Sequence, residues 1–434
     1  MQVSRGDNEP LSQQYDRVRQ HALAICEPLA VDDYGVQPVP DVSPPKWHLA
    51  HTSWFFETFL LKPQLSGYQT FDPAYEYLFN SYYNGVGEQH PRTDRGNLSR
   101  PTVDEVYAYR AHVDSSMHEL LASAESNSSS KELAKAVVLG LQHEQQHQEL
   151  LVTDIKYILG NSPVHAPYSS SSDTDKRAVC DSTLDIGSCP LEFHDFEGGV
   201  CEIGVSTAVS AAEESSSAYS FAFDNETPRH KQWLEPFKLA NRLINNKEYL
   251  EFVADGGYER SELWLSEGWA AVQAGRFGKT PAPLYWRQRD GCWYEYILTG
   301  LSELRPHAAV SHVSYYEADA YARWAGHRLA SEAEWEVAAH RSLNSPGKNA
   351  QPKLLQMTDS LWQWTQSAYS AYPGFKPLAG TLGEYNGKFM SGQMVLRGGS
   401  VATPEGHARL TYRNFFYPPD RWQFTGIRLA AQCQ

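Results

Sequence analysis

The chain has 434 residues, of which 41% are hydrophobic and 12% aromatic, a composition that supports sizeable cores and excludes a largely disordered protein. Its formal net charge of -15 argues against a nucleic acid or an anionic membrane as partner. The length predicts about two to three domains.

The first ten residues are polar, without the apolar segment of a secretory signal, and no apolar run is long enough to span a bilayer. The six cysteines include no CxxC pair, so reduced thiols are the ordinary expectation. We therefore expect a cytoplasmic protein without a membrane span and without a cysteine-rich zinc site.

Apolar residues recur at helical spacing in four segments of the N-terminal part, near residues 11–28, 47–61, 102–121 and 133–158. Thr102 and Glu105 form the sequence of a capping box at the start of the third segment. Four helices with apolar faces predict a four-helix bundle over residues 1–165.

The composition changes after a serine-rich stretch that begins at Ser169, and we expect a flexible linker over residues 166–184. Residues 185–434 are rich in Gly, Trp, Tyr and Pro, with short strand-like runs and many turns. Only one clear helix, near 313–326, and a shorter one near 331–340 are expected there. The predicted fold class is α+β, in two domains.

His143 and His147 lie four residues apart in the fourth predicted helix. At about 100° per residue, both imidazoles project from one helix face, which they share with Ala136, Leu150 and Asp154. That face is expected to point into the bundle. Two inward imidazoles at this spacing indicate either a metal site or a pair of hydrogen-bonded core histidines.

A catalytic metal site needs at least one more ligand. His48 and His51 both lie in the second predicted helix, either could serve, and the spacing does not decide between them. A closed structural site would need a fourth ligand, and Cys26 is the one cysteine near these helices. This favours a catalytic centre over a binding module that holds a structural metal.

Six motifs follow one another along the chain. The first half contains Trp47-His-Leu-Ala-His51, Asn80-Ser-Tyr-Tyr-Asn-Gly-Val-Gly87 and His143-Glu-Gln-Gln-His-Gln-Glu149. The second half contains Phe221-Ala-Phe-Asp-Asn-Glu-Thr-Pro-Arg-His230, Gly326-His-Arg-Leu-Ala-Ser-Glu-Ala-Glu-Trp335 and Leu396-Arg-Gly-Gly-Ser400. The first set resembles the N-terminal half of ergothioneine-biosynthetic sulfoxide synthases. The second set resembles the domain named after formylglycine-generating enzymes and sulfatase modifiers.

This resemblance implies a DinB-like bundle joined to a C-type-lectin-like domain, with the active site between them. It also implies a mononuclear non-haem iron(II) held by His51, His143 and His147, with O2 as co-substrate. His48 falls where relatives carry a residue that is not a ligand. The residues alone would favour zinc, which commonly uses three histidines, so iron rests on the resemblance.

The implied reaction joins a thiol sulfur to C2 of the imidazole of hercynine (Nα-trimethylhistidine) and oxidises the sulfur to a sulfoxide. The thiol is cysteine or γ-glutamylcysteine, and the segment with Tyr82, Tyr83, Arg92 and Arg95 resembles the cysteine-using subgroup. An ovothiol-type synthase, which takes unmethylated histidine, is an enzymatic alternative. A non-catalytic metal-containing module is the alternative from another class.

Arg92 and Arg95 carry guanidinium groups that match carboxylates in a bidentate manner. The resemblance implies that they hold the carboxylate of the thiol substrate, with Arg92 expected as the closer contact. The alternative is a pair of solvated loop arginines. Gln146 is implied to hydrogen-bond the substrate imidazole, and its ordinary alternative is an amide between helices.

Tyr82 and Tyr83 are the candidate catalytic phenols, because a phenol near the reacting oxygen can supply a proton or a hydrogen atom. The hypothesis is that one of them favours sulfoxide formation over simple thiol dioxygenation. If the segment is extended, neighbouring side chains face opposite sides, and only one of them faces the metal. Tyr369 and Tyr372 are further candidates.

Asn414, Phe415 and Phe416 are expected at the trimethylammonium group of hercynine, because aromatic faces and amide oxygens recognise a quaternary ammonium. One of the two phenylalanines should belong to the core, since neighbours in a strand face oppositely. Cys292 and Cys433 do not form the cysteine pair of formylglycine-generating enzymes. The second domain should therefore line the substrate site rather than hold a second catalytic centre.

Overall fold

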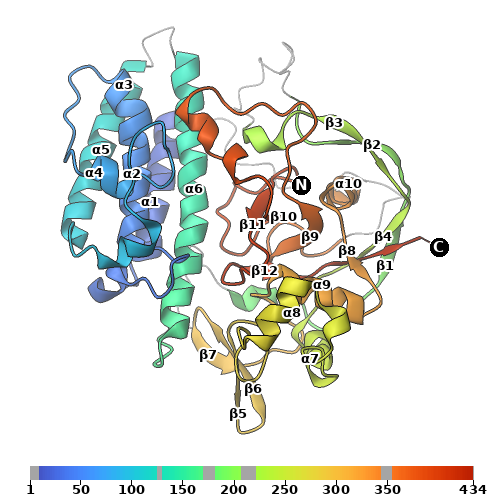
Figure 1. The fold of residues 1–434 in the computed structure, drawn as a ribbon. Coiled ribbons are helices and arrows are strands. Elements are labelled where there is room, and N and C mark those ends of the chain that lie inside the picture. The colour runs from blue at the N-terminus through green and yellow to red at the C-terminus, as the bar shows by residue number, and fades with distance from the viewer. Residues whose placement is uncertain (1–8, 125–129, 170–180, 207–220, 344–353, 434) are drawn as a thin grey trace.

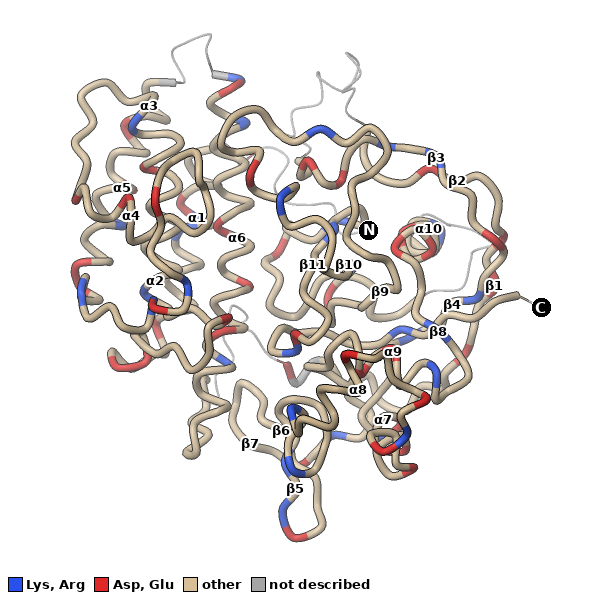
Figure 2. Tube along the Cα trace, in the orientation of Figure 1, with Lys and Arg blue, Asp and Glu red and all other residues tan. Residues whose placement is uncertain are grey.

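The structure is a computed structural model, and it describes residues 9–124, 130–169, 181–206, 221–343 and 354–433. A helical body and a mixed α/β body lie side by side, and the long helix α6 (Ser130–Asn161) runs along the boundary between them (Figure 1). Acidic and basic residues are distributed over both bodies (Figure 2), so both contribute to the charge of the described surface.

The helical body is a four-helix bundle, as predicted. Its helices are α1 (Leu11–Cys26), α2 (Pro45–Phe56), α5 (Val103–Ala124) and α6. The capping box at the start of α5 forms: Thr102 N donates to Glu105 Oε2 (2.6 Å) and Glu105 N donates to Thr102 Oγ1 (3.2 Å). Every residue of α2 is buried, because α2 packs against both α5 and α6.

Short helical segments extend the bundle beyond α2. A π-helical turn at Glu57–Leu61 continues α2 into α3 (Lys62–Gln64), and α4 (Tyr75–Phe79) follows in the stretch expected to be loop-rich. α4 ends directly before Asn80, so it places the tyrosine motif beside α2.

An internal ion-pair network ties α6 to the other helices. The carboxylate of Glu144, which is fully buried, accepts from Arg19 Nη1 on α1 (2.9 Å) and from Arg110 Nη2 on α5 (2.5 Å). A buried charge needs this kind of pairing to be tolerated, so the network fixes the rotation of α6 about its axis.

The C-terminal body contains several small sheets. One has the order β1 (Phe193–Phe196), β4 (Phe237–Ala240), β13 (Leu429–Gln432), β8 (Arg328–Leu329), and another has β11 (Asn414–Phe416), β10 (Met394–Arg397), β9 (Trp362–Ala368), β12 (Thr425–Gly426). The others are the pair β2 (Gly199–Ile203) and β3 (His230–Leu234), and the meander β5 (Trp286–Arg289), β6 (Cys292–Ile297), β7 (Gly300–Glu303). The mixed sheet with β11 faces the bundle (Figure 1).

Among the described residues of this body, four α-helices accompany the sheets: α7 (Asn246–Ala254), α8 (Ser266–Gln273), α9 (Tyr315–Trp324) and α10 (Glu332–Leu343). The sequence predicts α9 and α10, whereas α7 and α8 were not expected from it. Both missed helices are shorter than ten residues, so they present too few turns for an apolar period to be recognised.

None of the described helices is both long and apolar enough to cross a membrane. The expected linker over 166–184 lies partly outside the described residues, which omit 170–180. Its boundaries stay a prediction.

Candidate metal centre at the domain boundary

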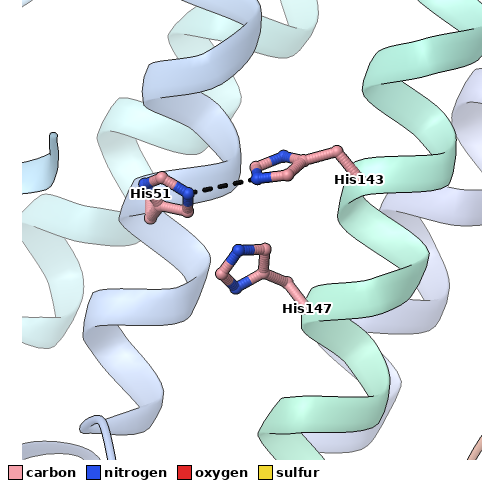
Figure 3. Close-up of side chains that lie close together, drawn as sticks. All are labelled: His51, His143 and His147. Carbon is pink, nitrogen blue, oxygen red and sulfur yellow. Dashed lines mark hydrogen bonds between the residues drawn. The ribbon is translucent and has the colours of Figure 1, made fainter. Parts of the chain in front are cut away.

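Three histidines from two helices meet between α2 and α6 (Figure 3). One ligand atom of each of His51, His143 and His147 lies within 4.8 Å of the others, and His51 Nε2 is 3.2 Å from His143 Nε2. His51 and His143 are buried, and His147 is partly buried. Of the two candidates in the second helix, His51 joins the pair on α6.

The ring of His51 is held in one orientation. Its Nδ1 lies 2.6 Å from the carbonyl oxygen of Phe79, so Nδ1 carries the proton and donates it. Nε2 therefore presents a lone pair toward His143. The indoles of Trp47 and Trp54 stack against this ring, with centroids at 4.6 Å and 5.4 Å.

His48 supports the site from outside the group of three. Its Nε2 lies 2.9 Å from Asp154 Oδ2, and its Nδ1 lies 3.0 Å from His147 Nδ1. A neutral His48 that donates to Asp154 accepts at Nδ1, which makes His147 Nδ1 a donor and leaves His147 Nε2 with a lone pair. Such a carboxylate and histidine chain orients a metal ligand.

The three imidazoles suit a transition metal ion. Burial lowers the pKa of His51, His143 and His147 well below the ordinary histidine value, so all three are neutral at pH 7. Neutral imidazoles are ligands for iron and zinc. In the described part of the chain no cysteine or carboxylate joins the group, so three protein ligands would leave coordination positions open.

Tyr82 and Tyr83 do not lie in an extended segment. The expectation that only one of them faces the metal assumed an extended segment, so it does not apply here. Asn80 Oδ1 accepts from Tyr83 N (2.9 Å), and Tyr83 O accepts from Val86 N (3.1 Å), which folds the chain into a turn. The two rings stack with centroids 4.7 Å apart. We call residues 80–87 the tyrosine turn.

Tyr385 is a phenol that the sequence analysis missed. Its ring lies 5.6 Å from that of His143 and 6.5 Å from that of Tyr82, and its buried hydroxyl has no hydrogen-bond partner among the described residues. Burial raises its pKa well above the ordinary value, so it is protonated. Tyr369 and Tyr372, the C-terminal candidates from sequence, instead contact Phe415 and Arg413 respectively.

Arg95 is the more deeply placed of the two predicted arginines. Its guanidinium carbon lies 3.3 Å from the centroid of the Trp47 ring, and Nη1 donates to Ser43 Oγ (2.9 Å). Within the described residues no carboxylate forms a salt bridge with it, although its side chain is buried, and burial lowers its pKa. Arg92 is exposed and donates to the carbonyl oxygen of Asp41, and its expected role as the closer contact to the thiol carboxylate stays a prediction.

Gln146 lies at the junction of the two bodies. Its Nε2 donates to the hydroxyl of Tyr412, a buried residue that the sequence analysis did not identify. Because Nε2 is engaged, the acceptor oxygen of the amide remains for another group.

A stripe of α6 next to the histidines binds the C-terminal body. Gln142 Oε1 accepts from His407 Nδ1 (2.8 Å), and Glu149 accepts from Trp362 Nε1 (2.5 Å) and Ser400 Oγ (2.7 Å). Gln142, Gln146 and Glu149 share one helix face by their spacing, and we call them the docking stripe.

Asn414, Phe415 and Phe416 form β11, where neighbouring side chains alternate as expected. Phe415 stacks on Tyr369 at 4.1 Å and lies 5.9 Å from Phe389, whose ring meets Tyr82 edge-on at 4.9 Å. Phe416 packs against Trp422 instead, and Asn414 Oδ1 accepts from Phe415 N. Phe415 is therefore the phenylalanine connected to the tyrosine turn.

Comparisons with known proteins agree with this architecture. The model of the DinB superfamily matches residues 14–151, and that of the sulfatase-modifying factor enzyme 1-like domain matches residues 196–352. Hercynine oxygenase of Mycobacterium tuberculosis is 30% identical over 90% of this chain and 91% of its own. The hercynine oxygenase of Mycolicibacterium smegmatis is 28% identical over 97% of this chain and 98% of its own. Ergothioneine biosynthesis protein 1 of Schizosaccharomyces pombe is 27% identical over 52% of this chain and 29% of its own.

A DinB-like bundle with a buried three-histidine group, closed by a domain of the sulfatase-modifying factor type, defines this chain as an oxygenase, an oxidoreductase that uses a metal and O2. The chain belongs to the hercynine oxygenase family.

Proposed function

We propose that this chain joins the sulfur of L-cysteine to C2 of the hercynine imidazole in an O2-dependent reaction that yields hercynylcysteine sulfoxide, a step of ergothioneine biosynthesis. The observation that carries the proposal is the three-histidine group between α2 and α6. The ring of Tyr385 lies 5.6 Å from that of His143, and Arg95, which forms no salt bridge with a described carboxylate, lies over the ring of Trp47. The names of the relatives support the substrate and the pathway.

His51, His143 and His147 would hold iron(II), which when bound supplies the redox chemistry with O2 and a common binding place for the reactants. Zinc accepts three histidines too, but it has no redox chemistry to offer an oxygenase. Three neutral ligands leave the full positive charge of the ion available to an anionic thiolate.

Arg95 is the best-placed partner for the carboxylate of the thiol substrate. It is buried without a salt bridge to any described carboxylate, and such a guanidinium is stabilised by an anionic ligand. Arg92 is exposed nearby and would add a second positive charge. γ-Glutamylcysteine carries a free cysteine carboxylate at the same distance from its sulfur, so Arg95 suits either thiol. The choice of cysteine rests on the likeness of the segment with Tyr82, Tyr83, Arg92 and Arg95 to the cysteine-using subgroup.

The opposite side of the site would bind hercynine. Gln146, whose Nε2 is held by Tyr412, offers its carbonyl oxygen to an imidazole N–H. The aromatic face of Phe415 and the amide of Asn414 suit the trimethylammonium group, for which a hydrogen-bond donor would be of no use. Tyr82 and Tyr83, or Tyr385, would supply a proton or a hydrogen atom to the reacting oxygen.

The test is anaerobic reconstitution with Fe(II), followed by O2 with hercynine and either cysteine or γ-glutamylcysteine, and mass spectrometry of the product. We expect the sulfoxide with cysteine, and none from a His143→Ala variant. Coupling only with unmethylated histidine would indicate the ovothiol-type reaction. No oxygen uptake and no sulfoxide with either thiol would contradict the proposal and favour a binding module.

A further inference from the structure

A segment of the C-terminal body reaches over the tyrosine turn of the bundle. It consists of two short 3₁₀ helices, Thr381–Glu384 and Gly387–Phe389, and lies against α6 in orange-red in Figure 1. We call residues 381–389 the covering segment. It carries Tyr385 toward His143 and meets residues almost 300 positions earlier in the sequence.

One carboxylate makes the main polar contact between the two. Glu384 Oε1 accepts from Gly85 N (2.9 Å), and Glu384 Oε2 accepts from Asn84 N (3.0 Å). Lys388 Nζ donates to Glu384 Oε2 (3.0 Å) and to the carbonyl oxygen of Tyr82. Charge-assisted hydrogen bonds of this kind are roughly twice as strong as neutral ones.

The steric fit between the two segments is close. A Cβ added to Gly85 would meet Thr381 Oγ1 at 2.7 Å and Glu384 Oε1 at 3.1 Å, so the backbone itself lies against the covering segment. Phe389 meets the ring of Tyr82 edge-on at 4.9 Å, and Lys388 Nζ lies 5.4 Å from the centroid of the same ring. A side chain at position 85 would therefore require Thr381 to shift.

Both segments are also anchored on their far sides. In the C-terminal body, Asp224 accepts from Asn386 Nδ2 (2.7 Å). In the bundle, Asn80 Nδ2 donates to Tyr83 O (3.0 Å), and the preceding Phe79 carbonyl accepts from His51. Glu384 thus links two structures near the metal centre: Tyr385, whose ring lies beside that of His143, and the tyrosine turn, which directly follows the Phe79 carbonyl that accepts from His51.

We propose that Glu384 is a positioning residue, which holds the tyrosine turn of one domain against Tyr385 of the other and so fixes three phenols around the metal centre. The inference rests on the proposed function, because the positioned phenols are expected to favour coupling of cysteine to hercynine over oxidation of cysteine to its sulfinate. Glu384 itself lies outside the group of three histidines and acts through the backbone amides of Asn84 and Gly85.

Hydrogen exchange on the full-length, metal-free protein tests the contact without any activity. In Glu384→Ala the amides of Asn84 and Gly85 lose a charged acceptor, and a peptide covering 82–87 should exchange about tenfold faster. Glu384→Gln should lie between, since one amide oxygen can still accept. Glu405→Ala, at an exposed position of the same domain, is the matched control and should match wild type. Unchanged exchange in Glu384→Ala would overturn the proposal.

The functional arm compares products of the iron-loaded enzymes. Glu384→Ala should lower the ratio of sulfoxide to cysteine sulfinate by at least about threefold, because misplaced phenols meet the reacting atoms less often. Its Fe(II) affinity should equal that of wild type. Faster exchange with an unchanged product ratio would overturn the positioning role. Absence of sulfoxide from wild type would instead refute the proposed function and leave the exchange result as a separate finding.

Discussion

At the scale of the residue, the hydrogen-bond partners of each histidine distinguish a metal ligand from a residue that only orients a ligand. His51 donates a hydrogen bond from Nδ1 to a backbone carbonyl and turns the lone pair of Nε2 toward His143, whereas both nitrogens of His48 are engaged by Asp154 and His147. The spacing of the two histidines in α2 could not reveal this. It depends on which ring meets α6, and that is a property of the helix packing.

The two histidines should therefore differ in their effect on metal binding. His51→Ala should abolish stoichiometric binding of Fe(II), because one of three ligands is lost. His48→Ala should weaken it by about 10–100-fold, the usual effect of removing a group that orients a ligand. Anaerobic calorimetric titration measures both, with His118→Ala on the exposed surface of α5 as control. Equal losses in the two variants would make His48 a ligand.

The phenols should govern which product forms. Tyr82→Phe with Tyr83→Phe should shift the product toward cysteine sulfinate, because the reacting oxygen loses its donor. Tyr385→Phe is the matched variant, since its hydroxyl is buried like that of Tyr83 and its ring lies 5.6 Å from that of His143. Chromatography of sulfoxide and sulfinate gives the ratio. A shift in Tyr385→Phe alone would transfer the role from the pair to Tyr385.

Asp420 should make stability depend on pH with an unusual sign. Burial and the nearby charge of Asp41 raise its pKa from 3.8 to about 7. Between these two pH values the folded chain holds a proton that the unfolded chain has released, so stability falls as pH rises from about 4 to 7.

Asp420→Asn removes this titration. Its advantage in the free energy of unfolding over wild type should grow by about 1–2 kcal/mol from pH 5 to pH 8, less than the full shift because the carboxyl is partly exposed. Chemical denaturation at several pH values measures the difference. An advantage that is constant with pH would contradict the raised pKa.

At the scale of the element, α2 and α6 approach closely where α6 has a glycine. A Cβ on Gly140 would meet the ring of Phe56 at 2.7 Å, and that ring is fully buried. The glycine costs helix propensity but lets α2 come near enough for His51 to reach His143.

Gly140→Ala should therefore destabilise the protein by about 1–3 kcal/mol, although alanine is the better helix former. Phe56→Leu in the same chain should recover part of the loss by making room. Thermal unfolding of the two variants checks this. A stabilised Gly140→Ala would mean that the helices can separate freely.

Long helices could be predicted from the sequence more readily than short ones. The long helices of the bundle present several turns of apolar period, and the capping box at Thr102 and Glu105 predicted the start of α5. The short helices α7 and α8 lack that repetition. The same holds for the residues of the site. His143 and His147 lie on one helix, and their spacing predicted them together. Tyr385 lies between two short 3₁₀ helices without a recognisable sequence pattern, and only the tertiary fold brings it to the histidines.

At the scale of the whole molecule, α6 joins the two bodies at more than one level. Below the docking stripe, Lys156 Nζ donates to Asp181 Oδ2 (2.7 Å) and lies 2.8 Å from His312 Nε2, and all three side chains are buried. His312 Nδ1 in turn faces the carbonyl oxygen of Trp422 (3.2 Å). In the interior, Lys156 thus connects α6 both to Asp181 in the segment between the bodies and to His312 of the C-terminal body.

Lys156→Met should lower the free energy of unfolding by about 3–5 kcal/mol, because it leaves Asp181 as an unpaired buried charge. The double variant Lys156→Met with Asp181→Asn should lose less, since no charge then remains. Denaturant titration followed by tryptophan fluorescence measures both. Equal losses in the single and double variants would show that the ion pair itself, rather than the stranded charge, matters.

The two adjacent faces of α6 make residues 142–149 sensitive to insertions and deletions. His143 and His147 face the bundle, while Gln142, Gln146 and Glu149 face the other domain. Inserting or deleting one residue inside this window would rotate everything beyond it by about 100° relative to the rest. The histidines could then no longer face the bundle while the docking stripe keeps its contacts with the other domain. We therefore expect residues 142–149 to tolerate single substitutions far better than the insertion or deletion of a residue.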